Sequence, residues 1–406
     1  MNVLFLTIGR MESIESHSLY PDLLRQFRDN GHSVCVVSQR EKRTGMPTAL
    51  IDDHGVKILY VRIGNITKCN FIEKGISTVM IEGQYLKAIK KYLPDVQFDL
   101  VLYSTPPITL VGVVKYIKKR YSAKSYLLLK DIFPQNAVDI GVMKKNGVKG
   151  LLYRYFRKKE KALYAVSDSI GCMSMANMKY VLAHNPEIAP NKVGVCPNSI
   201  SPIRMFVTDE ERSEIKRRYN IPDDKTVFVY GGNLGKPQGI LFIIECLRRQ
   251  KDNDKAYFLV VGDGTEYSKL QSFVQSEKQS NVRLMQRLPK EDYDRMIAAC
   301  DVGLLFLDHR FTIPNFPSRL LSYMQACLPV LACTDPNSDV GSVIEDGGFG
   351  WWCESNDVEL FSDLVNSAMS ADLKVMGSIG YEYLCKHYSV DSAYEKIMGQ
   401  TLSIVW

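Results

Sequence analysis

Several motifs that would assign this 406-residue chain to a particular class of protein are absent. Its ten cysteines include no C-x-x-C pair, and its six histidines form neither an H-E-x-x-H motif nor a pair four residues apart. These absences argue against a zinc site or another metal held by the protein. Five cysteines lie in or beside apolar stretches, namely Cys35, Cys172, Cys196, Cys300 and Cys333. That placement is typical of buried thiols in a reducing compartment rather than of a disulfide framework.

Long hydrophobic runs are also missing. The uncharged stretch from Leu100 to Val114 is interrupted by Pro106 and Pro107, and it is shorter than the roughly 20 residues needed to span a bilayer. The chain opens on an apolar run at residues 3–6, without the basic region and cleavage site of a signal peptide. We therefore expect a cytoplasmic protein, which can touch a membrane without crossing it.

The overall composition excludes fibrous, low-complexity and disordered proteins. Hydrophobic residues make up 46% of the chain and charged residues 24%, as in ordinary soluble globular proteins. At roughly 150 residues per domain, the length favours two domains.

Charge is distributed unevenly along the chain. Residues 1–200 carry 29 Lys and Arg against 16 Asp and Glu, a net charge of +13, whereas residues 201–406 have a net charge of −7. The basic half is suited to an anionic partner such as a membrane surface, a nucleic acid or a phosphorylated acceptor. Lys-rich helix faces exposed to water are the alternative explanation.

The hydrophobic pattern predicts an α/β protein. Apolar runs at residues 3–6, 34–37, 100–103 and 126–129 alternate with helical windows at 18–30, 76–93 and 111–121. After a turn-rich linker at 197–202, runs at 227–230, 258–261, 302–306 and 330–332 alternate with windows at 210–218, 240–249, 290–299 and 317–326. Continuous apolar runs indicate strands of parallel sheets buried on both faces. We predict two Rossmann-like domains facing across a cleft, with ligands at the carboxyl ends of the strands.

The segment from Tyr230 to Gly239 follows a predicted strand and precedes a helix. Its glycines would let backbone amides approach an anion, and Lys236 could neutralise a phosphate. The segment is neither G-x-G-x-x-G nor a Walker loop, which disfavours NAD and ATP. A simple tight turn is the alternative.

The segment from Pro314 to Met324 opens a second helix. Ser318 or Asn315 could cap it, and Pro317 suits its first turn. Arg319 in that turn opposes the helix dipole unless an anion binds there, so we predict a diphosphate site.

Two further motifs are less specific. Gly262, Asp263 and Gly264 follow the strand that ends at Val261 and suit a structural turn. Lys130 and Asp131 follow a buried strand and could bind a sugar hydroxyl or handle a proton, or form a structural salt bridge.

A basic amphipathic segment spans Lys144 to Tyr164. Its apolar residues recur at helical spacing, and its other faces carry Arg154, Arg157, Lys158, Lys159 and Lys161. A separate basic group, Lys115, Lys118, Lys119 and Arg120, adds to the positive charge of this half of the chain. Such a helix can lie on an anionic leaflet, or its apolar stripe can face the core. The apolar residues of the stripe are Val148, Leu151, Leu152, Tyr155, Phe156 and Leu163.

In combination, these motifs resemble the glycosyltransferases of family 4, which have the GT-B fold, and in particular the branch that builds capsule, exopolysaccharide and O-antigen units. The likeness covers nearly the whole chain. It rests on NGHSV at 30–34, YSTPP at 103–107, KDIFPQ at 130–135, PNS at 197–199, YGGN at 230–233, VGDG at 261–264 and PSRLLSYM at 317–324.

The resemblance implies that a sugar is transferred with retention of configuration, without a metal or another cofactor. The donor would be a nucleotide sugar, most plausibly a UDP-sugar. The acceptor would be linked to polyprenyl diphosphate at the inner face of the membrane. The resemblance also implies an acceptor domain at 1–200, a donor domain at 201–387, and a C-terminal helix at about 388–406 that packs back on the first domain. The donor and its diphosphate would be held by Gly231, Gly232, Asn233, Lys236, Gln238, Gly264, Asn315, Phe316, Pro317, Ser318, Arg319 and Ser322. Lys130, Asp131 and His17 would be catalytic, and Gly9, Ser16, Ser104 and Pro106 would lie on the acceptor side.

The chain departs from the family pattern at several positions. The family's pair of glutamates would fall on Pro314 and Ser322, and its usual Arg and Lys in the first loop of the second domain on Asn233 and Gln238. Two other functions therefore stay open: a nucleotide-sugar epimerase on the same fold, and a non-catalytic protein that binds nucleotide sugars. The sequence has no nucleic-acid recognition motif.

Overall fold

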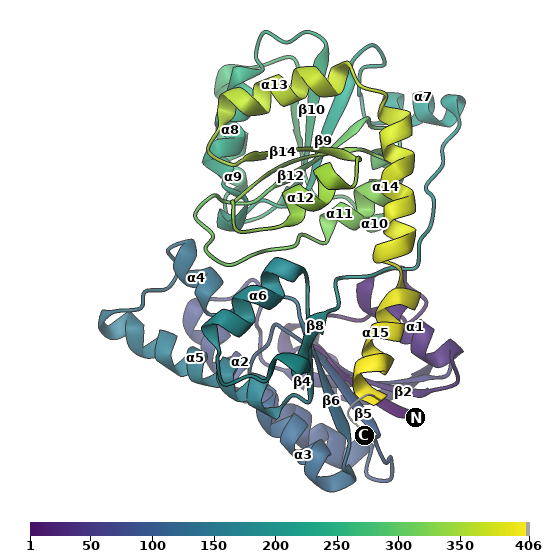
Figure 1. The fold of residues 1–406 in the computed structure, drawn as a ribbon, viewed down its shortest axis with the longest axis vertical. Helices are drawn as coiled ribbons and strands as arrows, with labels where there is room; N and C mark the ends of the chain where they lie inside the picture. The colour runs from purple at the N-terminus through teal and green to yellow at the C-terminus, as the bar shows by residue number, and fades with distance from the viewer. Residues whose placement is uncertain (403–406) are drawn as a thin grey trace. The chain divides into compact units, whose positions relative to one another are not determined.

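A computed structural model describes residues 1–402, except for the side chains of residues 71, 72, 74, 148 and 149. The chain forms two compact units (Figure 1). Unit 1 comprises residues 1–201 and the C-terminal segment from Ser389, and unit 2 comprises residues 202–388. The last four residues of the predicted C-terminal helix, 403–406, lie outside the described residues.

Unit 1 is built on an eight-stranded sheet with the order β3-β4-β2-β1-β5-β6-β7-β8. All neighbouring strands are parallel except β3 and β4, which form an antiparallel hairpin. The strands are β1 Asn2–Leu6, β2 Ser33–Glu41, β3 Ala49–Asp53, β4 Val56–Ile63, β5 Leu100–Ser104, β6 Lys124–Leu129, β7 Ser169–Cys172 and β8 Val193–Val195.

Helices connect these strands, as expected for parallel pairs. They are α1 Leu19–Asp29, α2 Phe71–Tyr92, α3 Val111–Tyr121, α4 Gln135–Asp139, α5 Gly147–Val166 and α6 Met175–His184. The C-terminal helix α15, Val390–Leu402, belongs to the same unit although it comes last in the sequence. Its residues Val390, Ala393 and Ile397 share a buried cluster with Val3 and Phe5 of β1.

Unit 2 is built on a six-stranded, all-parallel sheet with the order β11-β10-β9-β12-β13-β14. Its strands are β9 Thr226–Asn233, β10 Ala256–Asp263, β11 Val282–Met285, β12 Val302–Phe306, β13 Val330–Thr334 and β14 Gly350–Glu354. Its helices are α7 Asp209–Arg218, α8 Ile240–Arg249, α9 Tyr267–Glu277, α10 Lys290–Ile297, α11 Arg319–Gln325, α12 Val340–Asp346, α13 Val358–Met369 and α14 Leu373–His387. The predicted α/β class with parallel sheets is confirmed.

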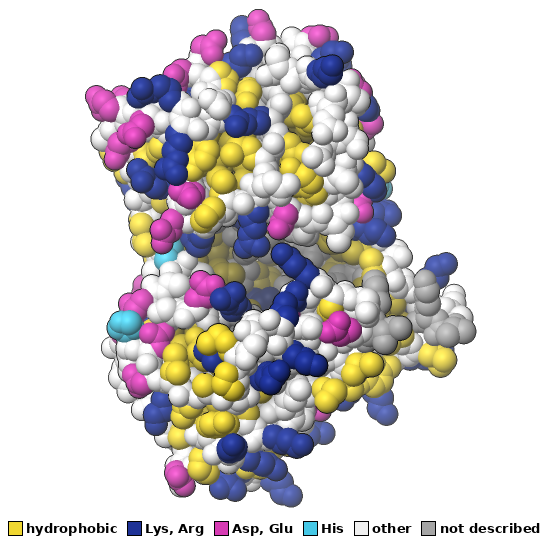
Figure 2. Space-filling model, turned by 180° about the vertical axis from the view of Figure 1, so that it is seen from behind, with side chains coloured by type: hydrophobic (Ala, Val, Ile, Leu, Met, Phe, Trp, Pro, Cys, Tyr) yellow, Lys and Arg dark blue, Asp and Glu magenta, His cyan; other side chains and the backbone are white. Residues whose placement is uncertain are grey.

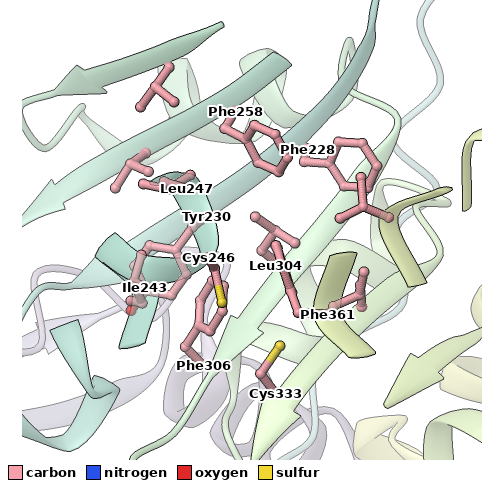
Figure 3. Packing of buried hydrophobic residues seen from close by; sticks show 14 of the residues in the cluster. Phe228, Tyr230, Ile243, Cys246, Leu247, Phe258, Leu304, Phe306, Cys333 and Phe361 are labelled. Atoms are coloured by element: carbon pink, nitrogen blue, oxygen red, sulfur yellow. The ribbon is translucent and has the colours of Figure 1, made fainter. Parts of the chain in front are cut away.

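The core of unit 2 lies between the sheet and the helices that cover it. Phe228 of β9 stacks on Phe258 of β10, with ring centres 5.2 Å apart, and Phe361 of α13 packs against Phe258 and Phe306 (Figure 3). β12 and β13 are buried at every residue. Continuous apolar runs therefore correspond to strands buried on both faces, and the polar ends of these strands carry the exposed chemistry.

The thiols and helices can be compared with the sequence expectations. All ten cysteines are free, and the five cysteines singled out from the sequence are buried. Among residues 1–402, no helix is both long and apolar enough to cross a membrane.

Candidate functional site

A pocket of about 430 Å³ opens in unit 2 where β9 and β10 end and α10 and α11 begin. We call it the unit 2 pocket. It lies at the carboxyl ends of parallel strands, the usual ligand position in open α/β sheets. Its lining consists of Gly232, Asn233, Val261, Gly262, Asp263, Arg287, Leu288, Lys290, Tyr293, Asp294, Arg319 and Ser322.

Glycines allow the two strand ends to run side by side at this pocket. β9 and β10 stay paired to their last residues, with Gly232 opposite Gly262 and Asn233 opposite Asp263. A Cβ atom on Gly262 would lie 2.0 Å from the carbonyl oxygen of Gly232. Gly232 has a φ of 148°, a backbone conformation that side chains rarely adopt. The glycines therefore set the floor of the pocket and leave it open.

Tyr323 of α11 holds the strand that forms this floor through hydrogen bonds of its hydroxyl group. Its side chain is fully buried, and its hydroxyl, which has one proton to share, lies 3.1 and 3.0 Å from the carbonyl oxygens of Val229 and Leu304. The same hydroxyl accepts the N–H of Gly231 at 3.2 Å. One side chain thus ties α11 to β9 and β12.

Arg319 supplies the main positive charge. Its guanidinium carbon lies 4.9 Å from the ring centre of Tyr293, and the side chain is partly buried. Arg319 forms no ion pair with any residue in the described part of the chain. Burial raises the pKa of Tyr293 well above its usual value, so the ring stays neutral beneath the cation. A desolvated, unpaired guanidinium favours an anionic ligand.

Two further cations line the pocket. Lys290, the first residue of α10, pairs with Asp294 one turn later. Arg287 is exposed and forms no ion pair within residues 1–402. Sequence reasoning missed both cations, together with Tyr293, Asp294 and Asp263 as site residues. The signal was present, because α10 begins directly after Pro289 and follows the short strand β11.

Four of the predicted donor residues line the unit 2 pocket: Gly232, Asn233, Arg319 and Ser322. The other eight do not line it: Gly231, Lys236, Gln238, Gly264, Asn315, Phe316, Pro317 and Ser318. Gln238 has a supporting position, since its Oε1 accepts hydrogen bonds from Nδ2 of Asn233 and N–H of Gly235, at 2.9 and 3.2 Å. Lys236 is exposed in the short 3-10 turn Lys236–Gln238.

The predicted helix cap at α11 is wrong. The helix begins at Arg319, and Ser318 already has helical angles, φ −64° and ψ −16°, so its side chain is not in the extended geometry of a capping residue. No side chain caps this helix; Asn315 instead donates from its own N–H to Ser338 Oγ at 2.8 Å. The first turn of α11 therefore presents its backbone N–H groups without a side-chain cap.

In unit 1, Lys130 and Asp131 follow β6 and are held by one hydroxyl. Thr105 Oγ1 accepts the N–H of both residues, at 3.0 and 3.2 Å. Their side chains form no ion pair with each other, so the structural salt bridge considered as the alternative does not form. Burial raises the pKa of Asp131 to about 6 and lowers the pKa of Lys130 to about 8. Asn136 Nδ2 donates to Asp131 at 2.7 Å.

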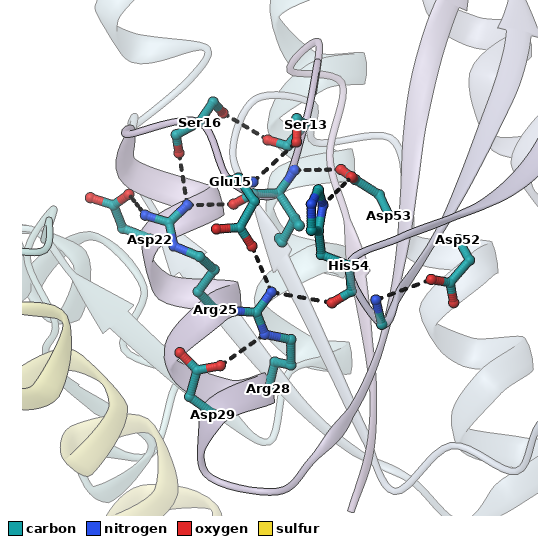
Figure 4. A network of polar contacts seen from close by, with 12 residues as sticks. Ser13, Glu15, Ser16, Asp22, Arg25, Arg28, Asp29, Asp52, Asp53 and His54 are labelled. Atoms are coloured by element: carbon teal, nitrogen blue, oxygen red, sulfur yellow. Dashed lines mark hydrogen bonds and ion pairs between the residues drawn. The ribbon is translucent and has the colours of Figure 1, made fainter.

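His17 is engaged with Asp22 of α1, with Nδ1 2.9 Å from the carboxylate. Asp22 is fully buried and also accepts from Arg25 at 2.5 Å and from the N–H of Ser201 at 2.9 Å. Figure 4 shows how Arg25 also reaches the carbonyl oxygen of Ser16, at 2.9 Å. The loop between β1 and α1 is thus held in one shape.

The other acceptor-side residues lie at the carboxyl ends of neighbouring strands. Gly9 follows β1, and its carbonyl oxygen accepts from Ser38 Oγ at 2.8 Å. Ser104 ends β5 and is buried, whereas Pro106 is exposed. The small cavity beside Lys130, about 10 Å³, has room for no more than about one water molecule. The side chains of Lys130, Asp131 and His17 therefore stay predicted, not demonstrated, catalytic groups.

Comparisons with known proteins agree with this geometry. Residues 211–381, which include the whole unit 2 pocket, match the family described as glycosyl transferases group 1. The chain is 28% identical over 304 residues to the probable glycosyltransferase WbjE of Pseudomonas aeruginosa, covering 73% of each chain. It is 25% identical over 220 residues to the putative colanic acid biosynthesis glycosyl transferase WcaI of Escherichia coli K12, covering 54% of this chain and 51% of the relative.

Solved structures establish the fold. A sucrose-phosphate synthase from Thermosynechococcus elongatus superposes with a TM-score of 0.75 at 13% identity, covering 100% of this chain and 99% of that one. HepE of Anabaena, solved in complex with UDP, superposes with a TM-score of 0.69 at 13% identity, covering 99% and 100%. The protein is therefore a glycosyltransferase of the GT-B fold, and its residues 211–381 match the glycosyl transferases group 1 family.

Proposed function

We propose that the protein transfers a sugar from a UDP-sugar to a lipid-linked saccharide in the biosynthesis of a surface polysaccharide, with retention of the anomeric configuration. The observation that carries the proposal is the unpaired, partly buried Arg319 in a pocket at the ends of β9 and β10. HepE was solved with UDP, and the name of WcaI refers to colanic acid biosynthesis; both support this choice of donor and pathway class.

Arg319 would stabilise the negative charge that develops on the leaving UDP. Preorganised cations and amides act strongly in such a role, because they do not need to reorient as the bond breaks. The sequence predicted Lys236 as a cation beside the diphosphate. Arg287 would have this role instead, because Arg287 lines the pocket and Lys236 does not. Asn233 and Ser322 would contact the donor through hydrogen bonds.

We also propose that no metal takes part. Within residues 1–402, no group of three or more His, Cys, Asp or Glu side chains is placed to hold an ion. The guanidinium groups of Arg319 and Arg287 would neutralise the negative charge of the diphosphate. Transfer should therefore proceed at an unchanged rate in excess EDTA, and a rate that is lost with EDTA and restored by Mg²⁺ would contradict this part of the proposal.

Unit 1 would bind the acceptor. Lys130 and Asp131 lie at the carboxyl end of β6, and the pKa values of about 8 and 6 that burial gives them suit proton handling near neutral pH. His17, oriented by Asp22, would bind a hydroxyl group of the reacting saccharide.

Unit 1 would also touch the membrane. On α5, the apolar residues Leu151, Leu152 and Tyr155 are 59%, 50% and 40% exposed, so this part of the stripe does not face the core. Leu163 is buried, and the side chain of Val148 lies outside the described residues. Figure 2 shows many Lys and Arg side chains on the surface of unit 1. Apolar side chains flanked by cations bind anionic lipid surfaces.

Membrane contact can be tested by co-sedimentation with vesicles. Phosphatidylglycerol vesicles should bind the protein, and phosphatidylcholine vesicles should bind it far less. Changing Leu151 and Leu152 together to Ser should reduce binding by about tenfold. Leu241→Ser on α8 is the matched control, because Leu241 is 65% exposed in the other unit. Equal binding by all variants would remove α5 from the proposal.

The function itself is tested with a panel of labelled nucleotide sugars and polyprenyl-diphosphate-linked saccharides. A UDP-sugar should give a labelled lipid-linked product, and NMR of that product should show the anomeric configuration of the donor. Inversion of configuration would overturn the retaining mechanism. An epimerised nucleotide sugar without acceptor would indicate the epimerase, and binding without any transfer would indicate the non-catalytic protein.

A further inference from the structure

A second and larger pocket, of about 920 Å³, lies in unit 1 at the carboxyl ends of β1 and β2. We call it the unit 1 pocket. Its walls include Ile8 and Arg10, which flank Gly9, and five residues at and after the end of β2, namely Gln39, Arg40, Glu41, Arg43 and Thr44. None of the residues predicted for the acceptor or the donor lines it.

The cations of this pocket differ in whether an acid neutralises them. Arg43 pairs with Glu41, which is buried, and Arg10 lies 3.5 Å from Glu12 at the exposed rim. Arg40 and Lys68 form no ion pair with residues 1–402. The pocket therefore keeps two uncompensated positive charges.

Arg40 is held in a defined position. Its guanidinium carbon lies 3.9 Å from the ring centre of Tyr60, which is only 5% exposed and whose hydroxyl donates to the carbonyl oxygen of Met11 at 3.0 Å. A guanidinium stacked on an aromatic face loses little further freedom when it binds an anion. The arrangement is that of a prepared anion site.

Gln39 provides an independent sign of a ligand. This residue is 8% exposed and lines the pocket, yet its Oε1 has no hydrogen-bond partner among the described residues. A buried carbonyl oxygen without a donor is costly and rare. A rotation of the Gln39 amide toward the pocket would let a bound hydroxyl group supply the missing donor, because the oxygen itself is not exposed in this structure.

The remaining wall is apolar. Ile8, Met11 and Met46 line it together with the Tyr60 ring. Cations, a hydrogen-bond acceptor and an apolar wall together suit the charged groups, hydroxyls and C–H faces of an acidic saccharide or of a sugar phosphate.

We propose that the unit 1 pocket binds an anionic group on the saccharide acceptor, with Arg40 and Lys68 contacting the anion and Gln39 a neighbouring hydroxyl. This inference rests on the proposed function, because it specifies the acceptor of that reaction. The anion is either the carboxylate of an acidic sugar or the phosphate that joins sugar to lipid. Both present oxygen atoms that a guanidinium can bind through two hydrogen bonds.

The two methionines of the pocket allow binding to be located directly. The full chain is labelled with ¹³C at its methionine methyl groups, and the signals of Met11 and Met46 are assigned by single substitution. Titrations with methyl glucuronide, methyl glucoside and methyl glucose phosphate then report on the pocket itself. We expect at least one anionic probe to shift the Met11 and Met46 signals with an affinity at least tenfold above that of the neutral glucoside.

The source of the anion follows from which probe binds. Preference for glucuronide indicates an acidic sugar, and preference for the phosphate indicates the lipid-diphosphate linkage. Arg40→Gln should lower the affinity for the preferred probe about tenfold. Lys68→Ala should lower it by a similar factor, and this change affects an exposed side chain and leaves the core untouched. Arg62→Gln is the matched control, because Arg62 is exposed on β4 and does not line the pocket.

The proposal is overturned if no probe shifts the two methyl signals, or if neutral and anionic sugars bind equally. It is also overturned if Arg62→Gln lowers the affinity as much as Lys68→Ala does. UDP binding, measured separately by calorimetry, keeps this test apart from the proposed function. Binding of UDP without binding of an anion in the unit 1 pocket would overturn only the proposed acceptor site. Binding of the anion without binding of UDP would overturn the proposed donor reaction.

Discussion

The guanidinium of Arg319 lies over the ring of Tyr293, with 4.9 Å between its central carbon and the ring centre. The aromatic face positions the cation without neutralising it, as an acidic partner would. Asp294, which follows Tyr293 in the sequence and lines the pocket, pairs with Lys290 instead. The unit 2 pocket therefore keeps its charge for a ligand.

Arg319→Ala should lower the turnover of sugar transfer by about 10²-fold, the scale expected for losing one contact to a developing negative charge. Initial rates with saturating acceptor measure this effect. Arg295→Ala is the control, because Arg295 is exposed on the same α10 that carries Tyr293 but does not line the pocket. Near-normal turnover of the Arg319 variant would remove this residue from the reaction.

Tyr323→Phe should destabilise unit 2 by about 1–3 kcal/mol, because it leaves the carbonyl oxygens of Val229 and Leu304 and the N–H of Gly231 without their buried partner. Urea unfolding followed by circular dichroism measures the change. The UDP affinity of the variant should fall as well, since Gly231 precedes the pocket floor. A variant as stable as the parent would mean that water replaces the hydroxyl.

Gly262→Ala should destabilise the protein by about 1–3 kcal/mol, because the new methyl group would meet the Gly232 carbonyl oxygen at 2.0 Å and push the strand ends apart. Gly83→Ala should have the opposite effect and stabilise the protein. Gly83 is exposed within α2, and a Cβ there meets nothing within 4 Å, so the change should add about 0.5–1 kcal/mol. Thermal unfolding of the two variants side by side tests both, and a harmless Gly262→Ala would contradict the close approach.

Asp131→Asn should raise stability at neutral pH. Burial raises the pKa of Asp131 from 3.8 to about 6, so the folded protein retains a proton that the unfolded chain releases. The free energy of unfolding therefore falls as pH rises from about 4 to about 6, and the carboxylate destabilises the fold above that range by up to about 3 kcal/mol. The free energy of unfolding of Asp131→Asn should exceed that of the parent protein at pH 7.5 and equal it near pH 4.

Urea titrations at those two pH values measure the difference. Asp95→Asn, a change at an exposed carboxyl, serves as the control and should alter stability little at either pH. A parent protein whose stability does not fall between pH 4 and 6 relative to Asp131→Asn would contradict the burial of this group.

Much of the sheet architecture could be predicted because buried parallel strands have simple patterns. The predicted helices at 111–121 and 240–249 coincide with α3 and α8. The hairpin of β3 and β4 was missed, although His54 and Gly55, with φ of 51° and 80°, form its turn. Partly exposed edge strands such as β3 and β14 lack the continuous apolar run that identified the central strands.

The site was predictable only where a junction between a strand and a helix carries glycines or a cation. Gly232 was found near the end of β9, and Arg319 was found at the first position of α11. Arg287 and Tyr293 were missed, since their role depends on which loop follows β11 and where α10 packs against the pocket. The unit 1 pocket was missed for a related reason, because Arg40 and Tyr60 meet only through the pairing of β2 with β4.

The return of α15 to unit 1 has a consequence for how the protein is made. Residues such as Ala393 and Ile397 complete a core that begins at Val3, and Gln400 accepts a hydrogen bond from Tyr126 at 2.6 Å. The N-terminal half of the chain therefore cannot complete its core until α15 has been synthesised. A premature stop after residue 388 would spare unit 2 and damage unit 1.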